Sequence, residues 1–165
     1  MSNAILYRMN NGIAGDVTRQ SVATIETQLL DSTAPFSAYG LFGKVNSNGK
    51  FSPVGAGDAA SAVYGVLVRP YPTQGANPSD PLGTSVPKTS GAADVLRRGY
   101  ISVKVNAGTA ALGGTVYVRV ANASTGKPIG GIEAASDTTN TIAVSGASFM
   151  GAADASGNVE IGFNI

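Results

Sequence analysis

Serine precedes lysine by three residues at three places in the chain, which is the spacing of the Ser-x-x-Lys pair of acyl-transfer enzymes. The pairs are Ser47 and Lys50, Ser85 and Lys88, and Ser124 and Lys127. In those enzymes the pair begins a helix, so that the amine reaches the serine hydroxyl. All three pairs here lie in turns that contain glycine or proline, without a companion Ser-Asp-Asn or Lys-Thr-Gly element. The sequence therefore favours a structural role in turns, rather than catalysis, for these three pairs.

Motifs of phosphate and sugar chemistry are incomplete. The stretch from Gly55 to Gly57 lacks the third glycine of the dinucleotide-binding pattern, and no strand–helix–strand unit surrounds it. Lys44, Lys50 and Lys127 are followed by valine, phenylalanine or proline, where a phosphate-binding loop needs serine or threonine. The carboxylates are dispersed, whereas a glycosidase needs two that converge in a cleft. We expect no catalytic residue and no cofactor.

Composition narrows the function further. The chain has no histidine and no cysteine, which excludes His-based triads, cysteine nucleophiles and the ligand sets that dominate zinc, copper and iron sites. Its 11 Lys and Arg against 10 Asp and Glu give a net charge of +1, too small to hold a nucleic acid. No apolar run has the length of a membrane span or a signal peptide. We expect a metal-free protein that binds neither nucleic acid nor membrane and is made in the cytoplasm.

The elements that must position any functional residue are β-strands. At 165 residues, the chain suits one domain with a single core. Apolar and polar residues alternate with the period of a strand, and turns rich in glycine or asparagine separate the alternating segments. The segments predicted as strands are 39–46, 63–69, 100–105, 116–120, 129–134, 142–145 and 158–165. We expect an all-β fold, either a compact antiparallel β-barrel or a β-sandwich.

The same alternation predicts which side chains form the core. These are Val66, Val68, Ile101, Val103, Val116, Val118, Val120, Val159, Ile161 and Phe163. Tyr117 and Arg119 fall on the opposite phase and are expected to face solvent. Segments 100–105 and 116–120 are expected to pair with each other through the connection between them.

Two stretches depart from the strand pattern. Residues 70–89 contain five prolines and two glycines, which predicts a long surface loop. Within residues 1–35, segment 17–30 fits either an amphipathic helix or an extended arm, and its threonine content favours the arm. Segments 58–63 and 92–98 each fit one helical turn. We therefore expect an N-terminal arm, 1–35, with its main contacts outside its own domain, and a single β domain, 36–165.

Arginine and tyrosine gather at the ends of predicted strands. Arg69 and Tyr71 close one strand, and Arg97, Arg98 and Tyr100 open another. Both residue types are favoured at protein interfaces, because each combines a flat apolar surface with directional polar groups. The same residues also suit solvated strand ends. The sequence leaves both interpretations open, and these five residues are its candidate contacts.

Six strings spread over nearly the whole chain resemble the structural cement, or head decoration, proteins of tailed bacteriophages. They are Ala14–Arg19, Tyr64–Pro72, Val95–Ile101, Gly113–Val120, Phe149–Ala152 and Val159–Ile165. The resemblance implies a non-enzymatic virion protein that binds the outer surface of the major capsid protein lattice and stabilises the expanded head. It also implies a homo-oligomer, either a dimer or a trimer. In such a protein we expect Arg69, Tyr71, Arg97, Arg98 and Tyr100, the candidates chosen by residue type, to lie at capsid or subunit contacts.

An alternative of a different class is a β-rich adhesion module, on the virion surface or secreted, that binds host glycans. Glycan sites usually stack sugars on exposed aromatic rings, and this chain has no tryptophan. The composition therefore favours the cement over the adhesion module.

Overall fold

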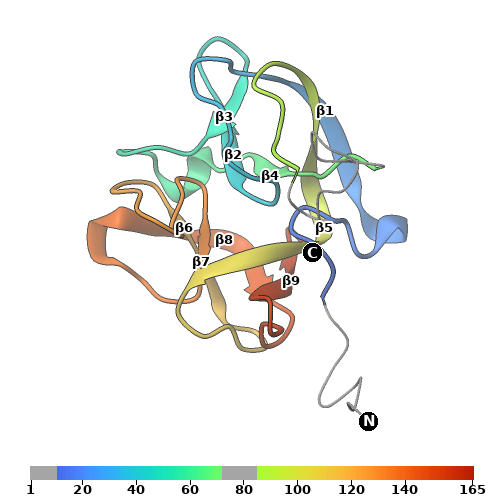
Figure 1. Ribbon diagram of the computed structural model, residues 1–165, viewed down its shortest axis with the longest axis vertical. Helices are drawn as coiled ribbons and strands as arrows, with labels where there is room; N and C mark the ends of the chain where they lie inside the picture. Colours follow the sequence, from blue (N-terminus) through green and yellow to red (C-terminus); the bar gives the residue numbers. More distant parts are fainter. Residues whose placement is uncertain (1–10, 72–84) are drawn as a thin grey trace.

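The structure is a computed structural model that describes residues 11–71 and 85–165 (Figure 1). One long strand runs through both halves of the fold and organises it. This strand, β5 (Gly91–Ala107), is 17 residues long. In its middle, Gly99 has a φ of 134°, and a Cβ added there would lie 3.0 Å from the Cα of Ala23. Only glycine fits such an approach. Residues up to Arg98 pair with strands of the N-terminal half, and residues from Gly99 onward pair with strands of the C-terminal half.

The N-terminal half forms a small barrel with the first part of β5. Its strands are β1 (Thr24–Leu30), β2 (Phe42–Val45), β3 (Phe51–Pro53) and β4 (Gly65–Leu67). They follow one another as β1-β3-β2-β4-β5, and β1 closes the circuit by pairing antiparallel with β5. The closure with β3 is a single parallel pair, Leu30 with Phe51. The core of this barrel contains Leu30, Phe36, Tyr39, Leu41, Phe51, Leu67 and Val95.

The C-terminal half forms a second barrel with the rest of β5. Its strands are β6 (Thr115–Arg119), β7 (Ile132–Glu133), β8 (Thr141–Phe149) and β9 (Asn158–Phe163). They follow the order β5-β7-β6-β8-β9, and β9 returns to pair with β5. The helical elements of the described residues are three short 3₁₀ helices, η1 (Gln20–Val22), η2 (Ala60–Ala62) and η3 (Thr138–Asn140). Strand closure, rather than helical cover, therefore buries both cores.

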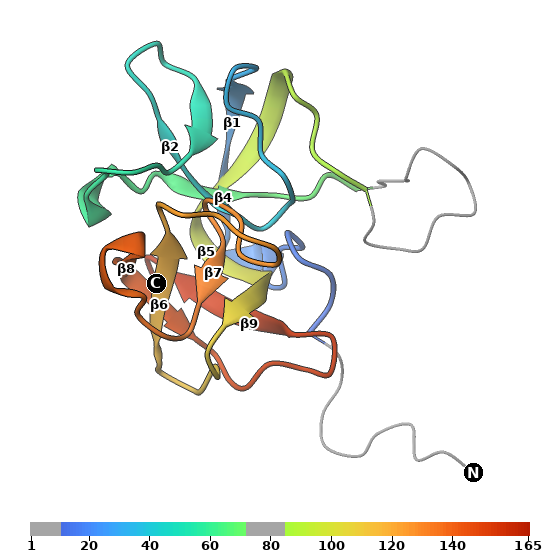
Figure 2. The ribbon, with the colours of Figure 1, turned by 60° about the vertical axis from the view of Figure 1, so that its left-hand side comes forward.

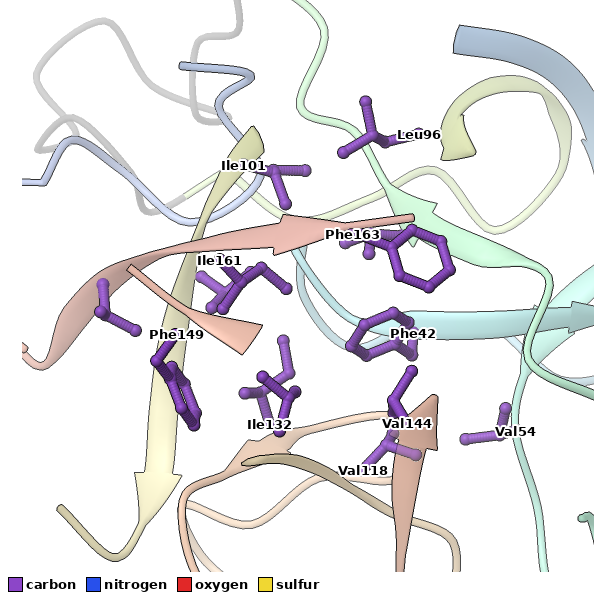
Figure 3. Close-up of a cluster of buried hydrophobic side chains, with 14 of the residues drawn as sticks. Phe42, Val54, Leu96, Ile101, Val118, Ile132, Val144, Phe149, Ile161 and Phe163 are labelled. Atoms are coloured by element: carbon purple, nitrogen blue, oxygen red, sulfur yellow. The ribbon is translucent and has the colours of Figure 1, made fainter. Parts of the chain in front are cut away.

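The two barrels lie against each other (Figure 2). They share one hydrophobic cluster. The Phe42 ring of β2 meets the Phe163 ring of β9 edge-on, with 5.4 Å between the ring centroids. Leu96 of the first barrel and Ile161 of the second belong to the same buried cluster (Figure 3). The barrels therefore pack as one body.

The alternation of the sequence predicted the fold class and the core correctly. The all-β barrel is confirmed, and all ten predicted core side chains are buried. The pairing of segment 100–105 with segment 116–120 was wrong, because β7 lies between them and pairs with both β5 and β6. Segment 92–98 is part of β5 and not a helical turn, since β1 and β4 supply strand partners on both its sides. Local turn signals do not reveal partners so distant along the chain.

Arg119 is buried, so the prediction that it faces solvent was wrong. Its side chain is 2% exposed, and its Nε lies 2.5 Å from Oε1 of Glu133, itself 1% exposed. A second nitrogen lies 2.6 Å from Oδ2 of Asp137, and a third donates to the carbonyl oxygens of Ala121 and Asn122. The hydrogen bonds to Glu133 and Asp137 raise the pKa of Arg119. Carboxylates from β7 and from the loop before η3 therefore neutralise a charge that the strand pattern assigned to solvent.

Residues 15–30 of the predicted arm hydrogen-bond to the barrels. The N–H groups of Gly15 and Thr18 donate to the carbonyl oxygens of Ser102 and Tyr100 on β5, over 2.8 and 3.0 Å, and β1 follows. Residues 1–10, and residues 72–84 of the predicted proline-rich loop, lie outside the described residues. The contacts of residues 1–35 with a partner stay a prediction.

Truncation of Phe163 tests the junction between the barrels. Phe163→Ala should lower the free energy of unfolding by about 3 to 5 kcal/mol, because the ring is 2% exposed and fills the shared cluster. Urea denaturation measures the change. Leu112→Ala is the control, since Leu112 is 77% exposed and its loss should cost less than about 0.5 kcal/mol. Equal costs would contradict the assignment of a shared core.

Removal of Glu133 tests the buried ion pair. Glu133→Ala should cost about 3 to 5 kcal/mol, because it leaves a buried guanidinium with one carboxylate partner fewer. Glu26→Ala is the matched control: Glu26 is 44% exposed, and its ion pair with Arg97 is worth about 1 kcal/mol or less. A similar shift of the urea midpoint in both variants would show that Arg119 does not depend on Glu133.

Candidate functional site

An apolar surface lies on β1 and on the η1 turn that precedes it. Val22, Ile25 and Leu29 are 42%, 39% and 59% exposed, and they are three of the seven large hydrophobic side chains exposed in the part of the chain that the structure describes. Strand alternation places Ile25 and Leu29 on the same face of β1. Single exposed apolar residues are ordinary, but a row of them marks an interaction surface. We call Val22, Ile25 and Leu29 the β1 surface.

The opposite face of β1 is occupied by the protein's own side chains. The Tyr64 hydroxyl donates to the carboxylate of Glu26 over 2.5 Å and accepts from Nε2 of Gln28 over 3.0 Å. The Arg97 guanidinium lies 3.5 Å from the centroid of the Tyr64 ring and 3.5 Å from the Glu26 carboxylate. The hydrogen bond to Glu26 is the main cause of the raised pKa of Tyr64. The β1 surface is therefore the face left for a partner.

Three of the five candidate contact residues lie on β5, next to β1. Arg97 packs on Tyr64, Arg98 is exposed and stands opposite Thr24 of β1, and Tyr100 lies under the Arg19 guanidinium at 3.8 Å. β5 thus carries all three residues, with Arg97 and Arg98 on opposite faces of the strand. Their role as contacts stays a prediction.

The other two candidates stand on the segment that follows β4. Arg69 has a side chain that is 8% exposed: it lies 4.7 Å from the Tyr39 ring and donates to the Ala14 carbonyl and to the Ser85 hydroxyl. Its surroundings are those of a structural residue. Tyr71 is 97% exposed at the boundary of the described residues.

A small polar cluster fastens the segment before η1 to β9. Arg19 donates to both carboxylate oxygens of Glu160, over 3.1 and 2.7 Å, and the Thr18 hydroxyl donates over 2.5 Å. Burial alone would raise the pKa of Glu160, but the hydrogen bonds from Arg19 and Thr18 and the charge of Arg19 outweigh it and lower the pKa. This cluster positions η1, and with it Val22.

A cleft lies between the two barrels in the described part of the structure. It measures about 740 Å³ and is lined by residues of both barrels. Arg69 and Lys104 are the charged residues in its lining, and Arg69 is ion-paired with Asp16, with 3.9 Å between Nε and Oδ1. In residues 11–71 and 85–165, no three Asp or Glu side chains lie close enough to hold a metal ion. None of the helices described is long and apolar enough to cross a membrane.

Comparison with known proteins identifies the family. A family model described as XM1 gp53 minor capsid protein matches residues 1–163. The chain belongs to the XM1 gp53 minor capsid protein family. The resemblance to phage capsid-associated proteins is therefore confirmed, and the protein is a virion component.

A solved structure shares the fold. A chain in the structure titled "The capsid of Myoviridae Phage XM1" superimposes with a TM-score of 0.68 at 20% sequence identity, over 99% of this chain and 97% of that chain. No curated protein matches the sequence. The fold thus recurs over 97% of a chain in a phage capsid.

The β1 surface escaped the sequence analysis. Segment 17–30 fits both a helix and an extended arm, so its sequence assigns no strand face to its apolar residues. The signal was present: Ile25, Thr27 and Leu29 alternate with Glu26 and Gln28. That alternation gives an apolar face next to a polar one, which a partner-binding strand requires.

Replacement of Arg19 tests the polar cluster. Arg19→Met removes a hydrogen-bond donor and a positive charge while burial of Glu160 remains, so the pKa of Glu160 should rise. A carboxyl whose folded-state pKa is lowered contributes stability above its unfolded-state value, near 4.5, and loses it as the pH falls through the folded-state value. The free energy of unfolding of the variant should therefore lose the part of its pH dependence that Glu160 contributes below about pH 4.5.

An NMR titration of the Glu160 carboxyl measures the shift directly, and urea midpoints across the acid range measure its effect on stability. Arg98→Met is the control, because Arg98 is exposed and has no carboxylate partner among the described residues. An unchanged Glu160 titration in Arg19→Met would contradict the assigned cause.

Proposed function

We propose that this protein is a non-enzymatic cement that binds the outer surface of the major capsid protein lattice and stabilises the expanded phage head. The observation that carries the proposal is membership of a minor capsid protein family along residues 1–163. The exposed β1 surface supports it, because a cement needs a face that its partner can desolvate cheaply. The shared core supports it too, since a stiff body transmits load between the lattice subunits it bridges.

The stabilisation follows from mass action. A protein that binds the assembled, expanded lattice and not its precursor adds its binding free energy to the stability of that lattice. One site occupied at 100 times its dissociation constant contributes about 2.7 kcal/mol, and a shell carries many such sites. Equal affinity for both states would shift nothing. Each copy must therefore bridge groups that come into register only on expansion.

Capsid rebinding tests the proposal. Purified protein is added to heads that lack it, in both the expanded and the unexpanded form, and bound protein is measured by co-sedimentation. We expect binding to expanded heads, at least tenfold weaker binding to unexpanded heads, and a higher rupture temperature for DNA-filled heads after the protein is added back.

Two results would contradict the proposal. One is equal rupture of heads with, without and after addition of the protein. The other is binding to isolated cell-surface glycans without binding to heads, which would support the adhesion module.

A further inference from the structure

The edge of β1 that faces away from β5 carries backbone groups without a strand partner. The N–H of Asp31 donates to the carbonyl oxygen of Phe51 on β3 over 3.0 Å, so the backbone groups at that position face away from β5. Backbone groups of alternate residues in a strand point to the same side, so those of Ile25 and Thr27 also face away from β5. Of the strands described, only β3 meets this edge, and only at Leu30. Ile25 and Thr27 therefore offer an open row of donors and acceptors.

Nothing in the sequence of β1 protects this edge. Exposed edge strands are usually kept apart from other chains by lysine, by proline or by being very short. β1 has seven residues, TIETQLL, with neither lysine nor proline. Its side chains next to the edge are uncharged, apart from Glu26, which Tyr64 and Arg97 already hold. The edge is thus suited to pair with another extended chain.

We propose that an extended segment of a capsid protein adds to this edge as a further β-strand. This inference rests on the proposed function and assigns the part of the protein through which it works. Alternating backbone donors and acceptors are matched by an extended polypeptide, and addition of a strand to a free edge is an established mode of recognition. β3 covers the edge of β1 from Leu30 onward. The stretch Thr24–Leu29 before it is left uncovered, and one added strand, continuing the line of β3, would fill that place.

The side chains around the edge define the chemistry of that segment. Its residues on the outer face would be apolar, to cover Ile25 and Leu29. At the Thr24 end stands Arg98, an exposed cation with no carboxylate partner among the residues described, so an acidic residue would face it there. The partner segment is therefore a short extended stretch with apolar residues at alternate positions and a carboxylate near one end.

The variant Thr27→Pro tests the open edge of β1 separately from the stability of the fold. The N–H of Thr27 points to the open edge, so Thr27→Pro removes that donor while the ladder to β5 stays intact. The Thr27 hydroxyl donates to Asp94 over 3.0 Å, and this bond is lost as well. Thr27→Ala is the matched control, because it loses the same hydroxyl and keeps the N–H. In co-sedimentation with expanded heads, Thr27→Ala should bind within about twofold of the wild type, and Thr27→Pro at least tenfold more weakly.

A second pair of variants avoids any change of backbone. Leu29→Lys places a charge on the β1 surface, and Leu112→Lys places one at another exposed leucine, 77% exposed. Leu29→Lys should weaken binding to expanded heads at least tenfold, and Leu112→Lys should not. Hydrogen exchange gives an independent reading: amides of residues 24–30 should exchange more slowly in protein bound to heads than in free protein. Should Thr27→Pro fail to fold by circular dichroism, the lysine pair and the exchange measurement decide.

The outcomes distinguish this inference from the proposed function. If the wild type does not bind expanded heads, the proposed function fails. If the wild type binds, and the edge variants bind equally well with unchanged exchange at residues 24–30, the inference is overturned and the proposed function stands. A dimer of the free protein in light scattering, abolished by Thr27→Pro, would also overturn it, because a second copy would then occupy the edge.

Discussion

The strand β5 has to pair with two different sets of partners, and the rest of the fold depends on how it does so. A chain with no long helix in its described part must cover each sheet face with another strand. Closing the sheet twice around one shared strand achieves this in residues 11–71 and 85–165, and it also removes most exposed edges. Gly99 makes the change of partners possible, because the chain at Ala23 passes where a side chain would stand. Position 99, where β5 changes partners, therefore has no room for a residue with a Cβ.

Charge is scarce in this chain, and much of it is held within the fold. Charged residues make up 13% of the sequence. Ion pairs join Arg19 to Glu160, Lys44 to Asp58, Arg97 to Glu26, and Arg119 to both Glu133 and Asp137. A charge that is already paired adds little to the field outside the protein, so association depends on apolar contact and directional hydrogen bonds rather than on long-range attraction. A surface of this kind suits a partner that is always close by, as within a virion.

Sequence patterns predicted what local alternation determines and missed what distant partners determine. Val116 and Val118 were placed in the core because their alternation with Tyr117 is unambiguous, and both are fully buried. Arg119 follows the same alternation, yet it is buried, because carboxylates 14 and 18 residues further along the chain neutralise it. The first half of β5 was missed for a similar reason, since Gly91–Arg98 has weak strand character and is held by β1 and β4.

In the candidate site, too, local sequence predicted some residues, and distant partners determined others. Residue type pointed to Arg97, Arg98 and Tyr100 as candidate contacts, and the structure places all three on β5. Residue type could not point to Ile25 and Thr27, because what distinguishes them is the direction of their backbone groups. That direction follows from the contact of β1 with β3, a single parallel pair between segments 21 residues apart in sequence.

The short overlap of β1 with β3 links stability to recognition. Had β3 extended along all of β1, the first barrel would be closed along its whole length and the backbone hydrogen bonds of β1 satisfied, but no backbone edge would remain for a partner. With closure confined to Leu30, β1 keeps its seven pairs with β5 and its inner face remains fixed by Tyr64 and Arg97. The strand is therefore held firmly enough to present its outer edge in one conformation, which lowers the entropy lost on binding. The same open edge exposes the free protein to unwanted pairing. In the complex that we propose, a capsid segment covers the edge on the shell and that hazard ends, so a virion protein can keep a binding surface that would be a liability in a protein that stays free.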